Sequence, residues 1–478
     1  MALPQSPAPE PFTAAASAAT GAKPDGGPAT RRELVIVSLV VALGLVIRLA
    51  LVAAAQGVEL YGDQAVYAAE AAQILAGVPT DGYRGPGYPA FLAAWQWLFG
   101  EGPGAPRVGN ALVGSLTILA FWALLREIST PRAAAIGAAI LACYPRAVFM
   151  PVYLFAENTY CLLLTFGIWM AIRAAGRGRR AAAIAAGLAF GLGILTREML
   201  IYFVPVVAGV LLAFGEHARR ERAVRALLMV AVAMVVVLPW TARNHRVHGT
   251  FVLVGFSDAI PLFEGNYVAE SPRAVFQKRV ALTNQYVEEA RQAGVEHPVR
   301  QRRIANERLR EDAWRAIRER QPGWILEKLA WNGPRILRPN VLREVLLGKW
   351  PLPHERQERI ARVLLFGVFL PVHVLLLSLG SMGLAHWRLA SAAVLPVLYL
   401  GFSIAIHLVA NAAHFRFEVP YEWVLIAGAA LFLDRGLPRT RMRRVVALVL
   451  LVLAIAPQLT LRDAWLSGIS PLPVQSGW

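Results

Sequence analysis

Acidic and basic side chains stand at the ends of several long apolar segments in this sequence, and their types suit work on hydroxyls and phosphates. A carboxylate can take the proton from a hydroxyl and so make it a nucleophile. An arginine grips a phosphate with two parallel hydrogen bonds and keeps its charge at any physiological pH. The charged residues that map to one boundary are Asp63, Arg84, Glu157, Arg197, Glu198, Arg243 and Arg416. Together they predict a site that binds an anion and abstracts a proton at the edge of a membrane.

Two carboxylates of this set are candidate acids or bases. Asp63 is the first candidate for the general base, and the alternative is that it caps a helix over residues 65–75. Glu157 is the second acid, and its alternative is a hydrogen bond to Asn158 or to a nearby tyrosine. The residue types alone leave both alternatives open.

The arginines also have structural readings. An arginine at the end of a span usually extends to the lipid headgroups, and we expect this of Arg48 in the first apolar segment. Arg197 and Glu198 can pair with other boundary charges. Arg243, Arg416 and Arg84 are the candidates for holding a phosphate.

Metal ligands and disulfides are not indicated. The external segments contain no Asp-x-Asp pair, and Cys143 and Cys161 lie inside apolar runs, so no thiolate cluster is expected. His407 and His414 are expected to pack or to donate hydrogen bonds. The sequence therefore predicts no obligatory cofactor, without excluding a divalent metal. The tryptophans expected at the membrane interface are Trp240, Trp324, Trp331 and Trp350.

The elements that position these residues are membrane-spanning helices. The chain has 478 residues, of which 56% are hydrophobic and only 17% are charged, and its mean hydropathy is +0.48. This composition excludes an ordinary soluble enzyme. Apolar runs recur from residue 34 to residue 456 and predict an all-α polytopic membrane protein with about eleven spans.

The distribution of lysine and arginine predicts the orientation of these spans. Most of these residues in the short connections fall in the set that includes the amino-terminal tail, and positive charge is retained on the cytoplasmic side. The amino terminus is therefore expected inside, and the site outside. The formal net charge of +17 is then a signal of topology and does not indicate nucleic-acid binding.

The chain divides into five segments on this reading. They are a disordered cytoplasmic tail (1–33), an amino-terminal transmembrane module (34–240) with a catalytic first external loop (56–107), a large external loop with amphipathic helices (241–358), carboxy-terminal transmembrane helices (359–460) and a short external tail (461–478).

Several short motifs resemble those of the C-type membrane glycosyltransferases, from residue 34 to residue 433. The resemblance is to bacterial enzymes similar to protein O-mannosyltransferases and the lipid A aminoarabinose transferase, the glycosyltransferase family 39-like group. The motifs are Asp63-Gln64-Ala65-Val66-Tyr67, Arg84-Gly85-Pro86-Gly87-Tyr88-Pro89, Ala156-Glu157-Asn158, Thr196-Arg197-Glu198, Pro239-Trp240-Thr241-Ala242-Arg243-Asn244 and His414-Phe415-Arg416-Phe417-Glu418-Val419-Pro420.

This resemblance implies a GT-C-type fold and a sugar transferred with inversion from a polyprenyl-phosphate donor to a lipid, glycan or protein acceptor. It implies a bacterial inner membrane protein, a partner of the lipid bilayer and not of nucleic acid, working at the external face. The family commonly has Asp-Glu in the first external loop where this chain has Asp63-Gln64. The implied catalytic residues are Asp63 and Glu157, and the implied substrate-binding residues are Arg84, Tyr67, Tyr88, Arg197, Arg243 and Arg416.

Two other classes of function compete with this one. A transporter or flippase of a lipid-linked substrate would place its polar groups near the bilayer midplane, usually in a repeated pattern. A non-catalytic assembly partner would use the large loop to bind another envelope protein and would tolerate replacement of Asp63. In this chain the ionisable groups lie at one boundary and no internal repeat is apparent, which disfavours the transporter. The assembly partner stays open, since only replacement of Asp63 separates it from an enzyme.

Overall fold

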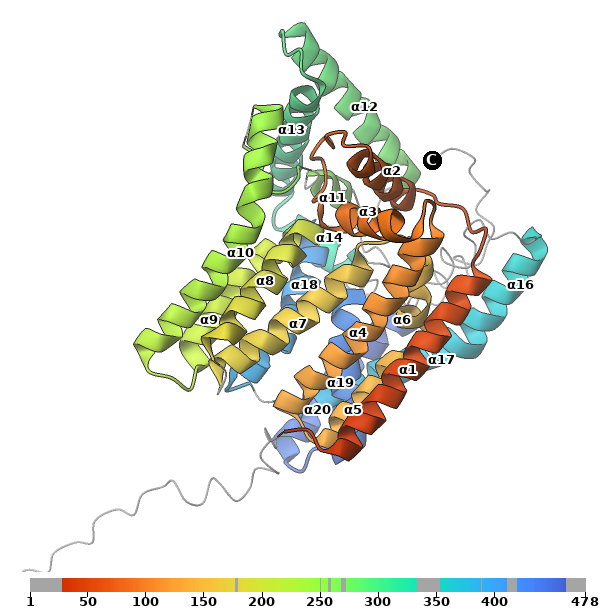
Figure 1. Cartoon of the computed structure of the whole chain (residues 1–478), viewed down its shortest axis with the longest axis vertical. Helices are drawn as coiled ribbons and strands as arrows, with labels where there is room; N and C mark the ends of the chain where they lie inside the picture. Colours follow the sequence, from red (N-terminus) through yellow and green to blue (C-terminus); the bar gives the residue numbers. More distant parts are fainter. Residues whose placement is uncertain are drawn as a thin grey trace, which may run out of the picture.

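The computed structural model is a bundle of helices with a smaller group of helices at one end (Figure 1). It describes residues 28–176, 179–249, 251–256, 259–267, 272–332, 353–387, 389–410 and 419–460. Within these ranges every regular element is helical, so the all-α fold class is confirmed.

The bundle is formed by the longer apolar helices. They are α1 (Arg31–Ala54), α4 (Gly104–Ile128), α5 (Pro131–Cys143), α7 (Glu157–Ala175), α8 (Arg180–Thr196), α9 (Val204–Phe214), α10 (Arg219–His248), α17 (Leu370–Leu384), α18 (Leu395–Ala410), α19 (Val419–Arg435) and α20 (Arg441–Thr460). The helices at or beyond the bundle ends are α2 (Asp63–Leu75), α3 (Gly87–Phe99), α6 (Pro145–Phe149), α11 (Ala259–Gly265), α12 (Pro272–Gln292), α13 (Pro298–Glu319), α14 (Gly323–Asn332) and α16 (His354–Leu364). Short 3₁₀ and π turns occupy η1 (Met150–Val152), η2 (Glu198–Tyr202), η4 (Leu365–Phe369) and η5 (Ala392–Val394).

Helix length and composition identify several membrane spans directly. Among the described residues, four helices are long and apolar enough to cross a membrane, and a bent pair over residues 131–152 makes a fifth if it counts as one span. Three further apolar helices are shorter. The expected number of about eleven spans therefore stays a prediction.

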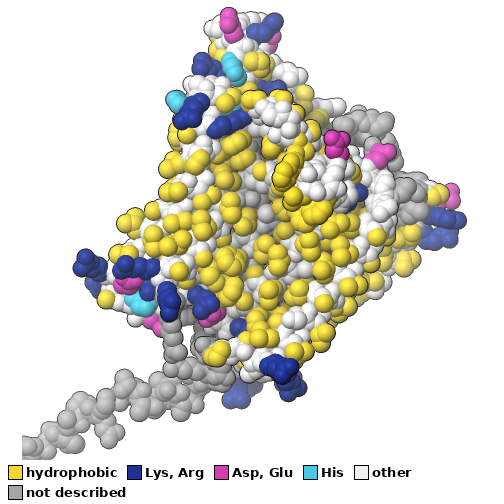
Figure 2. Space-filling view, in the orientation of Figure 1, with side chains coloured by type: hydrophobic (Ala, Val, Ile, Leu, Met, Phe, Trp, Pro, Cys, Tyr) yellow, Lys and Arg dark blue, Asp and Glu magenta, His cyan; other side chains and the backbone are white. Residues whose placement is uncertain are grey.

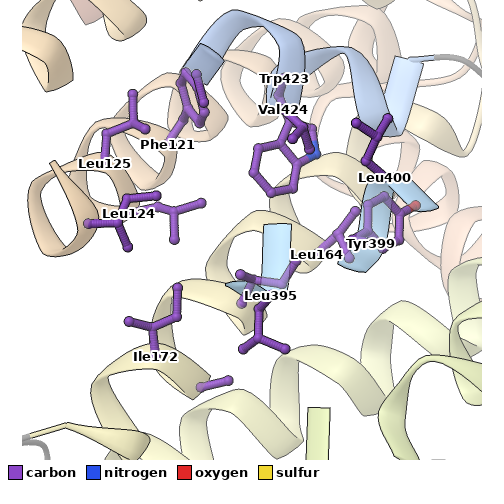
Figure 3. Close-up of a cluster of buried hydrophobic side chains, with 14 of the residues drawn as sticks. Phe121, Leu124, Leu125, Leu164, Ile172, Leu395, Tyr399, Leu400, Trp423 and Val424 are labelled. Atoms are coloured by element: carbon purple, nitrogen blue, oxygen red, sulfur yellow. The ribbon is translucent and has the colours of Figure 1, made fainter. Parts of the chain in front are cut away.

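The centre of the bundle is an apolar core shared by helices that are distant in sequence. Figure 3 shows Phe121 of α4, Leu164 of α7, Tyr399 of α18 and Trp423 of α19 in one cluster of buried side chains. The rings of Phe121 and Trp423 lie edge to face with their centroids 5.9 Å apart. Burial of such large side chains joins the amino-terminal and carboxy-terminal helices into one body.

The outer surface of the bundle is apolar as well, while charges gather at its two ends (Figure 2). Arg180 of α8 pairs with Glu221 of α10 at 2.7 Å at one end. The other end carries α2, α3, α12 and α13 (Figure 1). An apolar belt between two charged ends is the surface that a bilayer requires.

A break at the end of α5 explains the position of Arg48. α5 ends before Pro145, and the chain bends by 55° there, so the last carbonyls of α5 lack helical partners. Arg48 donates to the carbonyl oxygens of Leu141 and Ala142 at 3.4 and 3.1 Å, and it is only 1% exposed. The expectation that Arg48 extends to the headgroups is therefore wrong.

A second buried charge cluster lies inside the bundle, near the same break. Glu422 of α19 is 3.3 Å from Nε of Arg146 on α6, and it accepts a hydrogen bond of 2.7 Å from the hydroxyl of Tyr144. His373 of α17 lies 3.9 Å from the same carboxylate oxygen. We call Glu422 and Arg146 the bundle pair. Together with His373, this pair ties α6, α17 and α19 together.

The helices between α10 and α16 include several that pack on each other around a small core of their own. α10 continues without a break to His248, so the loop expected from residue 241 leaves the helix only after that residue. Trp324 is buried in this core and donates to Oδ1 of Asn266 at 2.7 Å. The expectation that Trp324 lies at the membrane interface is wrong, because α11 and α13 cover its ring.

Candidate active site

The loop between α2 and α3 brings an acid and an arginine of the predicted site into contact. Nη2 of Arg84 donates to Oδ1 of Asp63 at 2.6 Å, and the two side chains are 20% and 25% exposed. Asp63 is the first residue of α2 and Gly62 is its N-cap, so Asp63 does not stand at the capping position. We call Asp63 and Arg84 the rim pair.

Two tyrosines pack in series beside the rim pair. The guanidinium of Arg84 lies 5.0 Å from the ring centroid of Tyr67, and the rings of Tyr67 and Tyr88 meet edge to face at 5.1 Å. Tyr88 has no exposed surface, and its hydroxyl is 3.1 Å from the amide nitrogen of Asn110. Tyr88 therefore supports Tyr67, and its predicted role in substrate binding stays a prediction.

Glycines let the Arg84 loop lie directly against the end of α8. A Cβ on Gly85 would overlap the carbonyl oxygen of Leu195, and one on Gly87 would lie 2.6 Å from Oγ1 of Thr196. Real Cβ atoms do not approach that closely, so any other residue would force the loop outward. The glycines of the Arg84-Gly85-Pro86-Gly87 motif are thus required for close packing against α8, and this packing fixes the position of Arg84.

Arg243 fixes the other side of the same loop. Its Nη2 donates to the carbonyl oxygen of Thr80 at 2.6 Å, and its guanidinium lies 4.6 Å from the ring centroid of Trp240. Arg243, a predicted phosphate ligand, is thus engaged with the backbone of the loop between α2 and α3. Asp81 in that loop pairs with Arg302 of α13 at 2.9 Å, which joins the loop to the helices that follow α10.

Glu157 and Arg197 form a second acid–arginine contact. Glu157 at the start of α7 is buried and pairs with the half-buried Arg197, which follows α8. The alternative in which Arg197 pairs with a boundary charge is therefore confirmed, and Glu157 bonds to an arginine instead of to Asn158. Both side chains line a small pocket with Tyr160, Met199, Tyr399, Ser403, His407 and Pro420.

Arg416 and His414 lie outside the described residues, so their predicted roles stay predictions. The described part of the site therefore contains Arg84 in contact with both Asp63 and Tyr67, and Glu157 with Arg197 as a separate pair.

Two positioning residues were not predicted from the sequence. Gln64 is fully buried, and its Oε1 accepts the backbone N–H of Leu154 at 3.1 Å. Arg107 is buried and donates to the carbonyl oxygens of Val58 and Val152 at 2.7 and 2.8 Å. A polar residue that bonds only to backbone leaves no spacing pattern, so no signal in the sequence could have identified these contacts.

Glu70 was also missed, although its spacing gave a signal. It follows Asp63 by seven residues and Tyr67 by three, so all three lie on one face of α2. Burial raises the pKa of Glu70 to about 7, against the opposing effect of Arg84 and with smaller contributions from Asp81 and Asp63. Burial likewise raises the pKa of Tyr83, to about 12.

No group of three or more His, Cys, Asp or Glu side chains is placed to hold a metal ion in the part of the chain that the structure describes. The donor sets present there are carboxylate–guanidinium pairs. Such a pair can take a proton at the carboxylate and hold an anion at the arginine.

Comparison with known proteins supports the resemblance drawn from the motifs. The family model of dolichyl-phosphate-mannose-protein mannosyltransferases matches residues 83–242, which include Arg84, Glu157 and Arg197. The undecaprenyl phosphate-alpha-4-amino-4-deoxy-L-arabinose arabinosyl transferase of Edwardsiella ictaluri is 29% identical over 150 residues, and that of Pseudomonas aeruginosa is 28% identical over 159 residues. These matches confirm the similarity of the chain to C-type membrane glycosyltransferases.

The matched stretch is 30% of this chain and 27% of the Edwardsiella protein, so the chain matches less than a third of the length of these curated relatives. Among solved structures, ArnT from Cupriavidus metallidurans bound to undecaprenyl phosphate is 15% identical, with 84% of this chain and 77% of that chain covered and a TM-score of 0.42. The oligosaccharyltransferase AglB from Archaeoglobus fulgidus, in complex with an inhibitory peptide and a dolichol-phosphate, is 17% identical, with 91% and 56% covered and a TM-score of 0.49.

Proposed function

We propose that this protein transfers a sugar from a polyprenyl-phosphate donor to an acceptor hydroxyl at the external face of a bacterial inner membrane. The rim pair is the observation that carries the proposal. Asp63 and Arg84 are partly exposed and in contact, so a proton acceptor and a phosphate ligand lie within reach of one substrate. The family match over residues 83–242 supports the same reading.

Arg84 has hydrogen-bonding capacity left for a donor phosphate. Its Nη2 is engaged by Asp63, whereas Nη1 is buried and has no hydrogen-bond partner among the described residues. A buried guanidinium nitrogen without a partner is unfavourable until an acceptor fills the position. A phosphate oxygen of the donor supplies that acceptor, and Arg416 provides a second cation in this proposal.

The reaction is then a single displacement with inversion. The acceptor oxygen attacks the anomeric carbon, Asp63 takes its proton, and the bond from that carbon to the phosphate oxygen breaks. The leaving polyprenyl phosphate gains negative charge, which Arg84 stabilises. Glu157 and Arg197 form the second acid–arginine pair of the proposed site, Tyr67 contacts Arg84, and Arg243 holds the loop. The proposed reaction uses no obligatory metal ion.

Transfer by the purified protein tests this function. The protein in liposomes receives synthetic polyprenyl-phosphate sugars of several kinds together with envelope extracts of cells that lack it. Mass spectrometry should find one sugar on an acceptor only when donor and protein are both present. If the donor instead changes leaflets without being consumed, the transporter reading replaces the enzyme.

The orientation of the chain is part of the proposal and has its own test. Single cysteines replace Glu289 on α12 and Arg220 on α10 in a chain whose Cys143 and Cys161 are alanine. An impermeant thiol reagent is applied to cells whose inner membrane is intact and accessible from outside. It should label position 289 and not position 220. Labelling of 220 alone would reverse the orientation and move the site to the cytoplasm.

A further inference from the structure

One face of α2 carries a second carboxylate beside the rim pair. Asp63, Tyr67 and Glu70 are spaced by four and three residues, which places them within one narrow stripe of the helix. Arg84 contacts the first two of these side chains, at 2.6 Å from Asp63 and 5.0 Å from the centre of the Tyr67 ring. The guanidinium therefore lies over the stripe that also holds Glu70.

The charges around Glu70 come from α2 and from the loop that follows it. Asp63 and Tyr67 lie on α2, and Asp81, Tyr83 and Arg84 lie in the loop. Asp81 has a partner of its own in Arg302. α3, which packs against α2, contributes Tyr88 and no charged residue. Arg84, which donates to Asp63, is thus also the cation whose charge opposes the raised pKa of Glu70.

We propose that Glu70 is a positioning residue for the transfer reaction, whose negative charge offsets Arg84 and so keeps Asp63 able to accept the hydroxyl proton. This inference rests on the proposed function. An arginine 2.6 Å from a carboxylate favours its ionised form and so makes it a weaker base. A second carboxylate nearby has the opposite effect on the first.

The partial burial of Glu70 gives this effect a pH dependence. Its raised pKa, about 7, means that Glu70 gains a proton as the pH falls from 8 to 6. The offsetting charge is then lost, Arg84 acts on Asp63 alone, and the transfer rate drops. Above the pKa the charge is present and the rate is high. The acid side of the rate profile should therefore be centred near pH 7.

The test is the pH profile of the maximal transfer rate in three variants. Glu70→Gln keeps the size of the side chain without its charge, Glu70→Asp keeps the charge, and Glu101→Gln is the matched control in an exposed position before α4. Glu70→Gln should be about tenfold slower at pH 8 and nearly flat between pH 6 and 8. Glu70→Asp should recover the slope at least in part, and Glu101→Gln should match the unchanged chain.

Two results would overturn the inference, and they can be told apart. If Glu70→Gln keeps the acid slope and the rate of the unchanged chain, Glu70 has no part in setting the basicity of Asp63, while the proposed function stands. If the unchanged chain transfers no sugar at any pH, the proposed function fails and this inference with it. Donor binding is measured beside each rate, so that an effect of Glu70 on the phosphate contact of Arg84 is separated from its effect on Asp63.

Discussion

Two acid–arginine pairs in this molecule have the same chemistry and opposite surroundings. In the rim pair, Asp63 and Arg84 are 25% and 20% exposed and lie at the start of α2 and in the loop between α2 and α3. In the bundle pair, Glu422 and Arg146 are 5% and 3% exposed and lie among α6, α17 and α19. The bundle pair also has a tyrosine hydroxyl on its carboxylate, whereas Arg84 keeps one buried nitrogen without a partner among the described residues.

The difference shows what separates a reactive pair from a structural one. A fully buried pair whose hydrogen bonds are made within the protein offers a substrate no access, and removal of one partner leaves a charge in an apolar interior. A partly exposed pair costs little to break and can exchange its partner for a substrate. We therefore expect changes in the bundle pair to affect stability and changes in the rim pair to affect transfer.

The largest expected effect is on stability, from the bundle pair. Arg146→Ala should lower the free energy of unfolding by about 3–5 kcal/mol, because Glu422 is left buried without its cation. The combined change Arg146→Met and Glu422→Leu should recover most of that loss, since two apolar side chains of similar volume need no counter-charge. Thermal unfolding of the purified protein in detergent measures both. Arg291→Ala, in an exposed pair on α12, is the control and should change little.

The next effect is on transfer, through the loop that carries Arg84. Gly85→Ala places a methyl group against the Leu195 carbonyl, so the loop must move away from α8. A displacement of about 1 Å at a reacting group can cost about 10²-fold in rate. Gly104→Ala, at a glycine with open space around it, should leave the transfer rate unchanged. Equal rates for the two variants would show that the position of the loop does not matter to the chemistry.

A smaller effect is expected on donor affinity, from Arg84 itself. Arg84→Lys keeps the positive charge but loses the planar fork, so binding to a polyprenyl-phosphate sugar should weaken by about tenfold, and Arg84→Ala should weaken it further. Binding to donor-containing nanodiscs measures the affinity without requiring transfer. If Arg84→Ala binds donor as the unchanged chain does, Arg84 is not the phosphate ligand and Arg416 is the next residue to test.

The sequence predicted the parts of this fold and site that depend on composition or on local spacing. Apolar runs predicted the helices of the bundle, and the order of short motifs brought Asp63, Arg84 and Tyr67 to one external loop. The bundle pair was not predicted, because residues 146 and 422 are joined only by packing across the core. Arg48 was misread for a related reason: the carbonyls that hold it are freed by a break in α5, a different helix.

The same limit applies to the individual roles of site residues. Tyr88 stands in a motif with Arg84, but only the packing of α3 on α4 shows that it is buried against Asn110. Gln64 departs from the acid common in the family, and its burial against Leu154 explains how an uncharged residue serves there. A motif therefore locates a site, and the contacts decide which of its members face the substrate.

The most direct test of the central claim is the transfer rate of Asp63→Asn measured beside its donor binding. Asparagine keeps the size of the side chain and removes the proton acceptor, so donor binding and thermal stability should stay nearly unchanged. The transfer rate should fall by about 10²-fold or more, the scale at which a positioned base contributes. A transfer rate equal to that of the unchanged chain would contradict the account, because the rim pair would then supply no base.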